Sequence, residues 1–206
     1  MIAIDAAQGT DEWKAARVGV PSGSNFDKIM AEGSGATRAA YLTSIALEIV
    51  TGIREEIQTN YAMQQGTDRE PLARAAYEAR TGEIVEEIGF CLHDAIRCGV
   101  SPDGLVGKKG LTEYKCPQPK THLEYMKRKD APPAYKWQIQ GQLWVMEREW
   151  CDFASWSCDF PLEAQLVVRR VYRDEDAIKK LESAVIKFID DANKEAEFIR
   201  NYKEPA

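Results

Sequence analysis

The stretches Ser101-Pro102-Asp103-Gly104 and Leu111-Thr112-Glu113-Tyr114-Lys115-Cys116-Pro117 decide the expected fold of this chain. The second stretch is typical of a short strand over 111–116. Because side chains of a strand alternate between its faces, Glu113 and Lys115 are expected to point to the same side. Asp103 stands in a Pro-Asp-Gly turn, and a glycine marks a second turn before the strand. A hairpin between these turns would place Asp103 beside Glu113.

These residue types at this spacing suit the binding of a divalent cation next to a phosphate. Two carboxylates supply the hard oxygens that Mg²⁺ or Mn²⁺ prefer. Such an ion polarises a phosphate and lowers the pKa of a bound water, and a neighbouring lysine can orient that water or neutralise the developing charge. Asp-Gly turns and exposed Glu-x-Lys strands are also common without any metal, so the motif alone leaves both interpretations open.

The composition indicates one globular domain. The chain has 206 residues, 44% of them hydrophobic and 29% charged, which suffices for a substantial core. We expect a single domain over 1–206, with a helical part over 1–60, a catalytic core over 61–172 and a C-terminal packing helix over 174–202. No apolar run approaches the roughly 20 residues of a membrane span. The first residues do not resemble a signal peptide, so the expected location is the cytoplasm.

Cysteine and histidine usage argues against other metal chemistries. The chain has only two histidines, His93 and His122, so His-based catalysis is not expected. The five cysteines form no C-x-x-C pair, whereas a zinc or iron–sulfur site needs closer pairing. In a reducing compartment they are most simply buried thiols: Cys91, Cys98, Cys116, Cys151 and Cys158.

The charge is unevenly distributed. A net charge of −6 argues mildly against a nucleic-acid partner, because phosphates are contacted by Lys and Arg. Residues 115–136 nevertheless carry six basic side chains against Glu124 and Asp130. The cluster Lys127-Arg128-Lys129 within this stretch is either a solvated face or part of a DNA track.

The hydrophobic periodicity predicts a central mixed β-sheet flanked by helices, an α/β (α+β) fold. A proline at position 71 is expected to kink the helix over 61–81 or to start it afresh, with Glu70 as the N-cap. The last helix has the clearest amphipathic pattern. Helices are expected over 13–18, 25–30, 37–51, 61–81, 123–129, 134–148 and 174–202, and strands over 83–90, 96–100, 111–116, 150–157 and 165–172.

Four motifs in this order resemble the lambda-exonuclease family of phage recombination nucleases, which belongs to the restriction-endonuclease-like superfamily. They are Trp13-Lys14-Ala15-Ala16-Arg17-Val18-Gly19, Gln65-Gly66-Thr67-Asp68-Arg69-Glu70, the frame from Ser101 to Pro117, and Trp137-Gln138-Ile139-Gln140-Gly141-Gln142-Leu143-Trp144-Val145. The resemblance extends from about Asp11 to Tyr172 and is more specific than any one motif.

The resemblance implies a role for each matching residue of the metal site. Asp103 and Glu113 look like metal ligands, with the backbone carbonyl of Tyr114 as a third oxygen. Lys115 looks like the lysine that handles the attacking water. Glu70 matches the helix carboxylate that completes the site. Gln138 matches a glutamine that helps to arrange the nucleophile, while nearby Gln140 is expected to be structural.

The resemblance also implies a pocket for a DNA 5′-phosphate. Arg17 and Ser24 fit that motif. Arg38 is a looser candidate, because the loop over 32–37 does not align cleanly. Each of these residues also has an ordinary interpretation: Glu70 as an N-cap, Gln138 as a link between helices, and Arg17 as a surface ion pair.

The implied activity is a 5′-to-3′ exonuclease that uses Mg²⁺, with Mn²⁺ as an alternative and two ions expected. It would degrade one strand of 5′-phosphorylated linear duplex DNA to 5′-mononucleotides and leave 3′ single-stranded tails for recombination. The resemblance further implies a homotrimeric ring and a single-strand annealing protein as partner, in a bacterial or phage-infected cell.

Three other functions remain open. One is a sequence-specific or structure-specific endonuclease on the same fold. Another is a non-catalytic module that binds DNA ends or the annealing partner, although an intact set of acidic and basic site residues argues against it. An iron–sulfur nuclease is disfavoured by the cysteine spacing.

Overall fold

A five-stranded mixed sheet carries the expected hairpin. The computed structural model describes residues 1–4, 6, 9–31, 35–54 and 61–204. The strands of this sheet follow the order β2-β5-β6-β7-β8, with β6 and β7 parallel and every other pair antiparallel. Their bounds are β2 Val85–Glu86, β5 Gly104–Val106, β6 Gly110–Lys115, β7 Trp150–Trp156 and β8 Leu166–Tyr172. The mixed sheet expected from the sequence is thus present.

The strands expected over 83–90 and 96–100 were wrong in extent. Only β2 pairs within 83–90, while β1 (Ile2–Ala3), β3 (Cys91–Leu92) and β4 (Gly99–Val100) form a separate antiparallel sheet. The chain leaves the first sheet before Gly89, where an added Cβ would lie 2.3 Å from the Ala6 carbonyl oxygen. This close approach to the N-terminal segment, unseen in the periodicity, divides the expected strand between two sheets.

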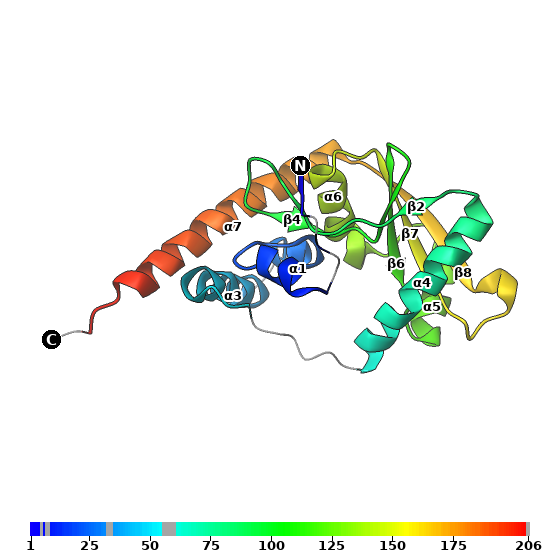
Figure 1. The fold of residues 1–206 in the computed structure, drawn as a ribbon, viewed down its shortest axis with the longest axis horizontal. Helices are drawn as coiled ribbons and strands as arrows, with labels where there is room; N and C mark the ends of the chain where they lie inside the picture. Colours follow the sequence, from blue (N-terminus) through cyan, green and yellow to red (C-terminus); the bar gives the residue numbers. More distant parts are fainter. Residues whose placement is uncertain (5, 7–8, 32–34, 55–60, 205–206) are drawn as a thin grey trace.

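Helices cover both faces of the larger sheet (Figure 1). On one face, α4 (Tyr61–Thr81) packs Ala73 and Tyr77 against Tyr114 of β6. On the other face lies α6 (Lys136–Val145), with α7 (Glu175–Asn201) packed behind it. The core between them includes Leu111, Ile139, Leu143, Phe153 and Leu181.

The helix α4 continues through Pro71 as a single element. The expected restart at this proline, with Glu70 as an N-cap, was therefore wrong. A proline removes only one helical N–H, and the packing of the α4 face on the sheet offsets that loss. The helix ends at Gly82, whose φ of 74° suits a glycine C-cap.

The N-terminal helices precede α4, and the second and third of them pack against α7 (Figure 1). They are α1 (Asp11–Ala16), α2 (Phe26–Ile29) and α3 (Ala36–Thr51). The α3 helix packs along α7, where the rings of Tyr41 and Phe188 stack with centroids 5.2 Å apart. The expected helix over 123–129 begins earlier as α5 (Pro119–Met126), because Pro119 occupies the first turn, where proline is favoured.

One glycine allows α2 and α6 to pack closely. An added Cβ at Gly141 of α6 would lie 2.3 Å from Cδ2 of Phe26, the first residue of α2. Phe26 is fully buried. Gly141 therefore sets how near the segment before α2 comes to α6.

In the part of the chain that the structure describes, no helix has the length and apolar character needed to cross a membrane.

Candidate active site

The β5–β6 hairpin brings Asp103 to β6, as the turn chemistry predicts. Gly104 pairs with Thr112, and the Asp103 N–H donates to the Thr112 carbonyl at 3.2 Å. The Tyr114 N–H donates to Asp103 Oδ2 at 2.6 Å. Asp103, Glu113 and Lys115 thus gather at one end of the hairpin, and this set is called the carboxylate hairpin below.

Glu113 is held by three donors. Lys115 donates to its Oε1, which confirms that the two side chains share one side of β6. Gln138 donates to the same oxygen at 2.6 Å, and Gln142 donates to Oε2 at 2.6 Å. Since Glu113 is almost fully buried, these donors compensate for the loss of water.

Gln142 is a site residue that the sequence prediction missed. It follows Gln138 by four residues on α6, and positions i and i+4 of a helix share a face. That spacing was a usable signal. A carboxylate accepts only, so the Gln142 amide nitrogen must face Glu113. Its Oε1 is then left buried and without a partner among the described residues.

Glu70 approaches from α4 and lines the cavity that also contains Asp103 and Glu113. Burial raises the pKa of Glu70, and the charge of Glu113 raises it further. Arg74 and Lys115 act in the opposite direction. The α4 carboxylate therefore contributes to the electrostatics of the carboxylate hairpin, as a residue that completes the site would.

Like charges are crowded in the carboxylate hairpin. Burial, followed by the charge of Glu113, raises the pKa of Asp103 well above its usual range. For Lys115, burial acts to lower the pKa, but Glu113 and Asp103 outweigh it and the pKa is raised. The two carboxylates therefore favour the charged form of Lys115, which suits it to orienting and neutralising groups.

The donor set fits a hard divalent cation. Within the described ranges, no three His, Cys, Asp or Glu side chains converge into a metal cluster by themselves. Mg²⁺ does not require one, since it keeps several waters and binds through one or two carboxylates and a substrate phosphate. An ionised carboxylate offers about four acceptor positions. One donor contacts Asp103 and three contact Glu113, so both retain acceptor positions.

Arg17 lies in a second group of residues, at the end of α1. Its guanidinium stacks on Trp13 at 3.9 Å from the ring centroid, and Nη2 donates to Ser22 Oγ at 3.3 Å. Its Nε is buried without a partner among the described residues. Burial, and then the charge of Arg54, lowers the pKa of Arg17 to about 10. Trp13, Arg17, Ser22 and Ser24 are called the end pocket below.

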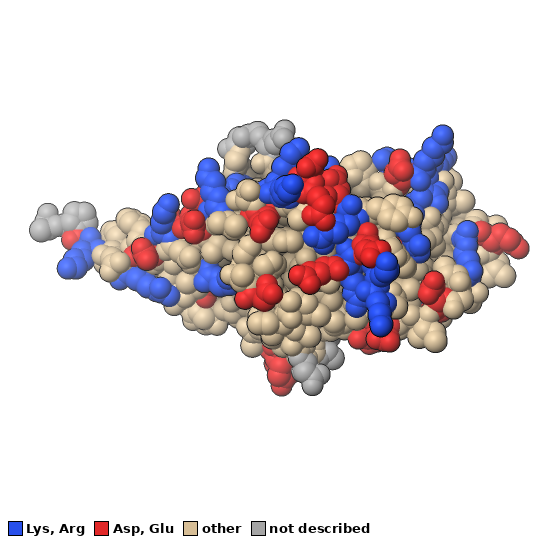
Figure 2. Space-filling model, turned by 90° about the horizontal axis from the view of Figure 1, so that it is seen from above, with Lys and Arg blue, Asp and Glu red and all other residues tan. Residues whose placement is uncertain are grey.

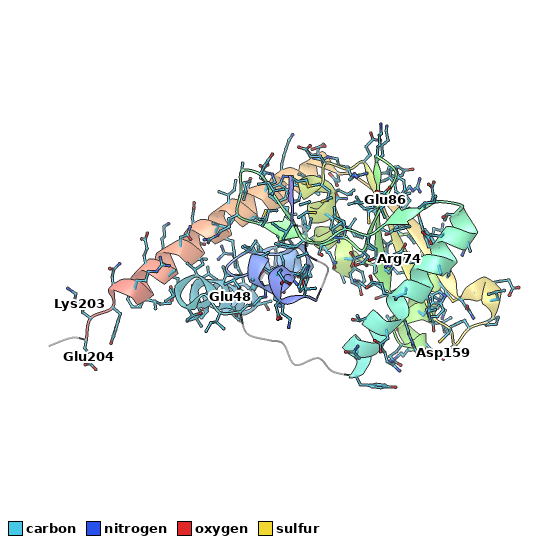
Figure 3. All side chains as sticks on the ribbon, viewed as in Figure 1. Glu48, Arg74, Glu86, Asp159, Lys203 and Glu204 are labelled. Atoms are coloured by element: carbon cyan, nitrogen blue, oxygen red, sulfur yellow. The ribbon has the colours of Figure 1, made fainter. Side chains whose placement is uncertain are left out.

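Glu48 of α3, which Figure 3 labels, and Arg54, which follows α3, contact the backbone next to the end pocket. Glu48 Oε2 accepts a hydrogen bond from the Gly19 N–H at 2.8 Å. Arg54 donates to the Arg17 carbonyl at 2.7 Å and lies 3.5 Å from Glu48. Tyr41 Oη accepts from the Ser22 N–H at 3.2 Å. These supports were not anticipated from the sequence.

One cavity contains both groups. It has a volume of about 420 Å³ and is lined by the end pocket residues and by Glu70, Asp103, Glu113, Lys115, Gln138 and Gln142. Ser101 lines it as well, and its Oγ accepts from Trp13 Nε1 at 3.4 Å. Residues that are more than 100 positions apart in the sequence thus face one space.

Two other predicted residues lie outside this cavity. Arg38 pairs with Asp191 of α7 at 2.8 Å and lies over the Phe188 ring, so its expected place in the 5′-phosphate pocket is not supported. Gln140 links α6 to the start of α7. It donates to the Tyr172 carbonyl at 2.9 Å and accepts from the Asp174 N–H at 2.9 Å, which confirms its structural role.

Charge on the face drawn in Figure 2 is mixed, with basic and acidic side chains interspersed. The Lys127-Arg128-Lys129 cluster is exposed at the end of α5. Its exposure is equally compatible with a solvated face and with a DNA track.

The chain matches a known protein family and solved structures. The sequence profile of the YqaJ-like viral recombinase domain matches residues 12–149. The crystal structure of an alkaline exonuclease, LHK-Exo from Laribacter hongkongensis, aligns with a TM-score of 0.88 and 40% identity over 93% of this chain and 96% of that one. LHK-Exo in complex with dAMP aligns with the same values.

A phage-related exonuclease from Haemophilus somnus 129PT shares the fold, with a TM-score of 0.69 and 17% identity over 85% of this chain and 96% of that one. No curated protein matches the chain. The profile covers more than half of the chain, and LHK-Exo is 40% identical over nearly all of it. The resemblance inferred from the motifs is confirmed: the chain belongs to the YqaJ-like viral recombinase family.

Proposed function

We propose that this protein is a divalent-metal-dependent exonuclease that degrades one strand of linear duplex DNA from its 5′ end during recombination. The observation that carries the proposal is the single cavity that contains both the end pocket and the carboxylate hairpin. Membership of a viral recombinase family and similarity to an alkaline exonuclease support a DNA exonuclease role in recombination.

Asp103 and Glu113, with Glu70 and the Tyr114 carbonyl completing the set, would hold Mg²⁺ or Mn²⁺. When bound, such an ion polarises the scissile phosphate and lowers the pKa of a water that attacks it. Two ions are proposed, as the family resemblance implies, with Glu70 of α4 as the carboxylate that completes the site. The residues of the chain then perform the remaining tasks.

Arg17 binds the 5′-phosphate and so fixes the first nucleotide. A guanidinium suits this role because its planar donors match phosphate oxygens, and stacking on Trp13 limits its motion. Ser22 and Ser24 supply neutral hydroxyls beside it. Binding the end before the chemistry begins converts the attack into a reaction of correctly positioned groups.

Lys115 donates to the phosphate or to the attacking water as negative charge develops. Its raised pKa keeps it protonated, so it stabilises charge and does not remove a proton. Gln138 and Gln142 keep the Glu113 carboxylate in one orientation. The expected products are 5′-mononucleotides and a duplex with a 3′ single-stranded tail.

Digestion of matched DNA substrates tests the proposal. Linear duplexes with a 5′-phosphate or a 5′-hydroxyl, and a closed circle, are incubated with Mg²⁺ or EDTA. We expect loss of the linear 5′-phosphorylated DNA alone, only with Mg²⁺, and release of mononucleotides. Cutting of the circle would favour an endonuclease of the same fold. Binding of ends without any cutting would favour a non-catalytic module.

A homotrimeric ring is part of the same proposal. In a ring, only the inner channel would need to be basic, which reconciles the net charge of −6 with DNA as substrate. A single-strand annealing protein is the proposed partner for the 3′ tail. Light scattering should give the mass of three chains, and a monomeric mass would remove the ring from the proposal.

A further inference from the structure

A second cavity adjoins the first at the acidic residues of the site. It has a volume of about 560 Å³ and shares Thr67, Glu70 and Asp103 with the first cavity. On its far side it is lined by Pro71, Arg74 and Glu87. Glu70 and Asp103 therefore border two spaces, of which only the first contains the end pocket.

Arg74 is the cation of this second cavity. It follows Glu70 by four residues on α4, so the two side chains share a face and are separated by about one helical turn of 5.4 Å. Figure 3 labels Arg74 beside α4. Its side chain is 19% exposed, which leaves it largely withdrawn from solvent.

The guanidinium of Arg74 is only partly satisfied within the described part of the chain. Nη1 donates to Glu87, and Nε is buried without a partner. A guanidinium has five N–H donors, so the Nη donors that Glu87 does not use remain for a ligand. The Glu87 side chain is 71% exposed. Ion pairs with so exposed a partner contribute little, so an incoming anion can compete for Arg74.

A strand of DNA provides such an anion at a defined place. If the 5′-phosphate occupies the end pocket and the scissile phosphate lies over the carboxylates, the strand continues into the second cavity. One helical turn is of the same order as the distance between neighbouring phosphates in a strand. The planar donors of an arginine match phosphate oxygens.

We propose that Arg74 binds the phosphate on the 3′ side of the scissile one, so that the strand passes from the first cavity to the second across Glu70 and Asp103. This inference rests on the proposed exonuclease function and adds to it a binding site for the part of the degraded strand that lies beyond the cut. Arg17 and Arg74 would hold the strand on either side of the bond that is cut.

The competing explanation is that Arg74 only balances the charge of Glu70. Arg74 does act to lower the pKa of Glu70, against burial and Glu113, which raise it. An electrostatic role of this kind would affect all substrates equally. A phosphate contact would depend on the charge of one particular linkage in the DNA. An experiment that removes this charge can therefore distinguish a phosphate contact from a purely electrostatic role of Arg74.

The test combines a neutral DNA linkage with an arginine substitution. Three 5′-phosphorylated duplexes are compared: one unmodified, one with a methylphosphonate at the second linkage from the 5′ end, and one with it at the sixth linkage. Binding is measured with Ca²⁺, after a check that the DNA stays intact, and cleavage is measured in a single turnover with Mg²⁺. The proteins are wild type, Arg74→Gln and the control Arg80→Gln. Arg80 lies on the same helix, but it contacts the Leu166 carbonyl at 2.6 Å and lines neither cavity.

In the wild type and in Arg80→Gln, the neutral second linkage should weaken binding about tenfold or more, as expected for a lost hydrogen bond to a charged group. Arg74→Gln should already bind the unmodified DNA at least about tenfold more weakly than the wild type does. The neutral second linkage should weaken binding by this variant no further. The sixth linkage should have little effect in any protein.

An equal loss from the neutral second linkage in wild type and Arg74→Gln would overturn the proposal. Failure of the exonuclease function is a distinct result, because it would appear as wild type that binds the unmodified duplex but does not digest it with Mg²⁺. The binding comparison would still decide whether Arg74 contacts that phosphate.

Discussion

The carboxylate hairpin and the end pocket face the same cavity but are built in different ways. In the hairpin, regular strand pairing and one face of α6 fix the charged groups, and Glu113 alone has three donors. In the end pocket, Arg17 follows a helix of 6 residues, and the segment around it is held by single contacts, from Glu48 of α3 to the Gly19 N–H and from Arg54, which follows α3, to the Arg17 carbonyl. The proposed chemistry would thus lie on regular elements, while the proposed recognition of the end would depend on a segment supported by residues distant in the sequence.

If this difference is correct, changes in the hairpin should stop the reaction, and changes in the end pocket should alter which DNA ends are accepted. Substitutions ordered from the reacting groups outward should have progressively smaller and more selective effects.

Lys115→Ala should have the largest effect. It removes the cation that stabilises developing charge, and removal of one such donor typically lowers kcat about 10²- to 10³-fold. Single-turnover digestion should be lost equally for 5′-phosphate and 5′-hydroxyl ends, whereas binding of DNA should remain. EDTA should abolish digestion by the wild type. A variant that retains most of its rate would remove Lys115 from the chemistry.

Arg17→Ala should affect the 5′-phosphorylated substrate selectively. Loss of hydrogen bonds to a charged group should lower kcat/KM for this substrate about 10- to 100-fold. The 5′-hydroxyl substrate lacks the group that Arg17 binds and serves as the control. An equal loss on both substrates would mean that Arg17 only maintains the structure of α1.

Gln142→Ala should weaken the binding of metal. Glu113 Oε2 would lose its donor, and loss of such a supporting contact typically lowers metal affinity about 10-fold or more. Calorimetric titration with Mg²⁺ measures this without any DNA. Gln140→Ala is the matched control, because Gln140 lies on the same helix but its side chain hydrogen-bonds to the backbone of Tyr172 and Asp174 and does not line the cavity. If the two variants bind Mg²⁺ alike, Gln142 does not orient Glu113.

Glu48→Ala should have a smaller effect, confined to end recognition. Removing the acceptor of the Gly19 N–H loosens the segment that carries Arg17. The loss of one hydrogen bond predicts about a fivefold drop in the preference for 5′-phosphate over 5′-hydroxyl ends. Glu48→Gln keeps an acceptor oxygen and should restore part of the preference. Thermal unfolding of both variants separates this effect from a general loss of stability.

The pH dependence of end preference should show the smallest change. Arg17 is charged below its pKa of about 10 and neutral above it. As pH rises from 8 to 10, the ratio of kcat/KM for the two ends should fall to about half, because kcat/KM reports ionisation of the free enzyme. The 5′-hydroxyl substrate accounts for all other titrations. A ratio that stays constant up to pH 11 would contradict this assignment.

The carboxylate hairpin could be predicted from the sequence to a greater extent than the end pocket. The hairpin was predictable because the alternation of β6 and the Pro-Asp-Gly turn are local patterns. The contact of Gln142 with Glu113 was also accessible, from the spacing of four on α6. The split between β2 and β3 was not, because it depends on the N-terminal segment passing Gly89.

The end pocket illustrates what local patterns leave out. Arg17 was identified through a family motif, but its support by Glu48 and Tyr41 depends on how α3 packs beside the loop. The ion pair of Arg38 could not be predicted for the same reason, since its partner Asp191 is 153 positions away. Such pairings are set by tertiary packing and leave no periodic trace in the sequence.

The close contact between Gly141 and Phe26 limits the distance between the end pocket and the residues around Glu113 in the first cavity. Gly141 lies between the two glutamines that orient Glu113, and Phe26 comes two residues after Ser24 of the end pocket. If the end pocket holds the 5′-phosphate as proposed, the absence of a side chain at Gly141 would help to set the distance from the bound end to the bond that is cut. In an exonuclease that releases mononucleotides, that distance would determine how many nucleotides each cut removes. A larger residue at position 141 would be expected to change the length of the fragments released.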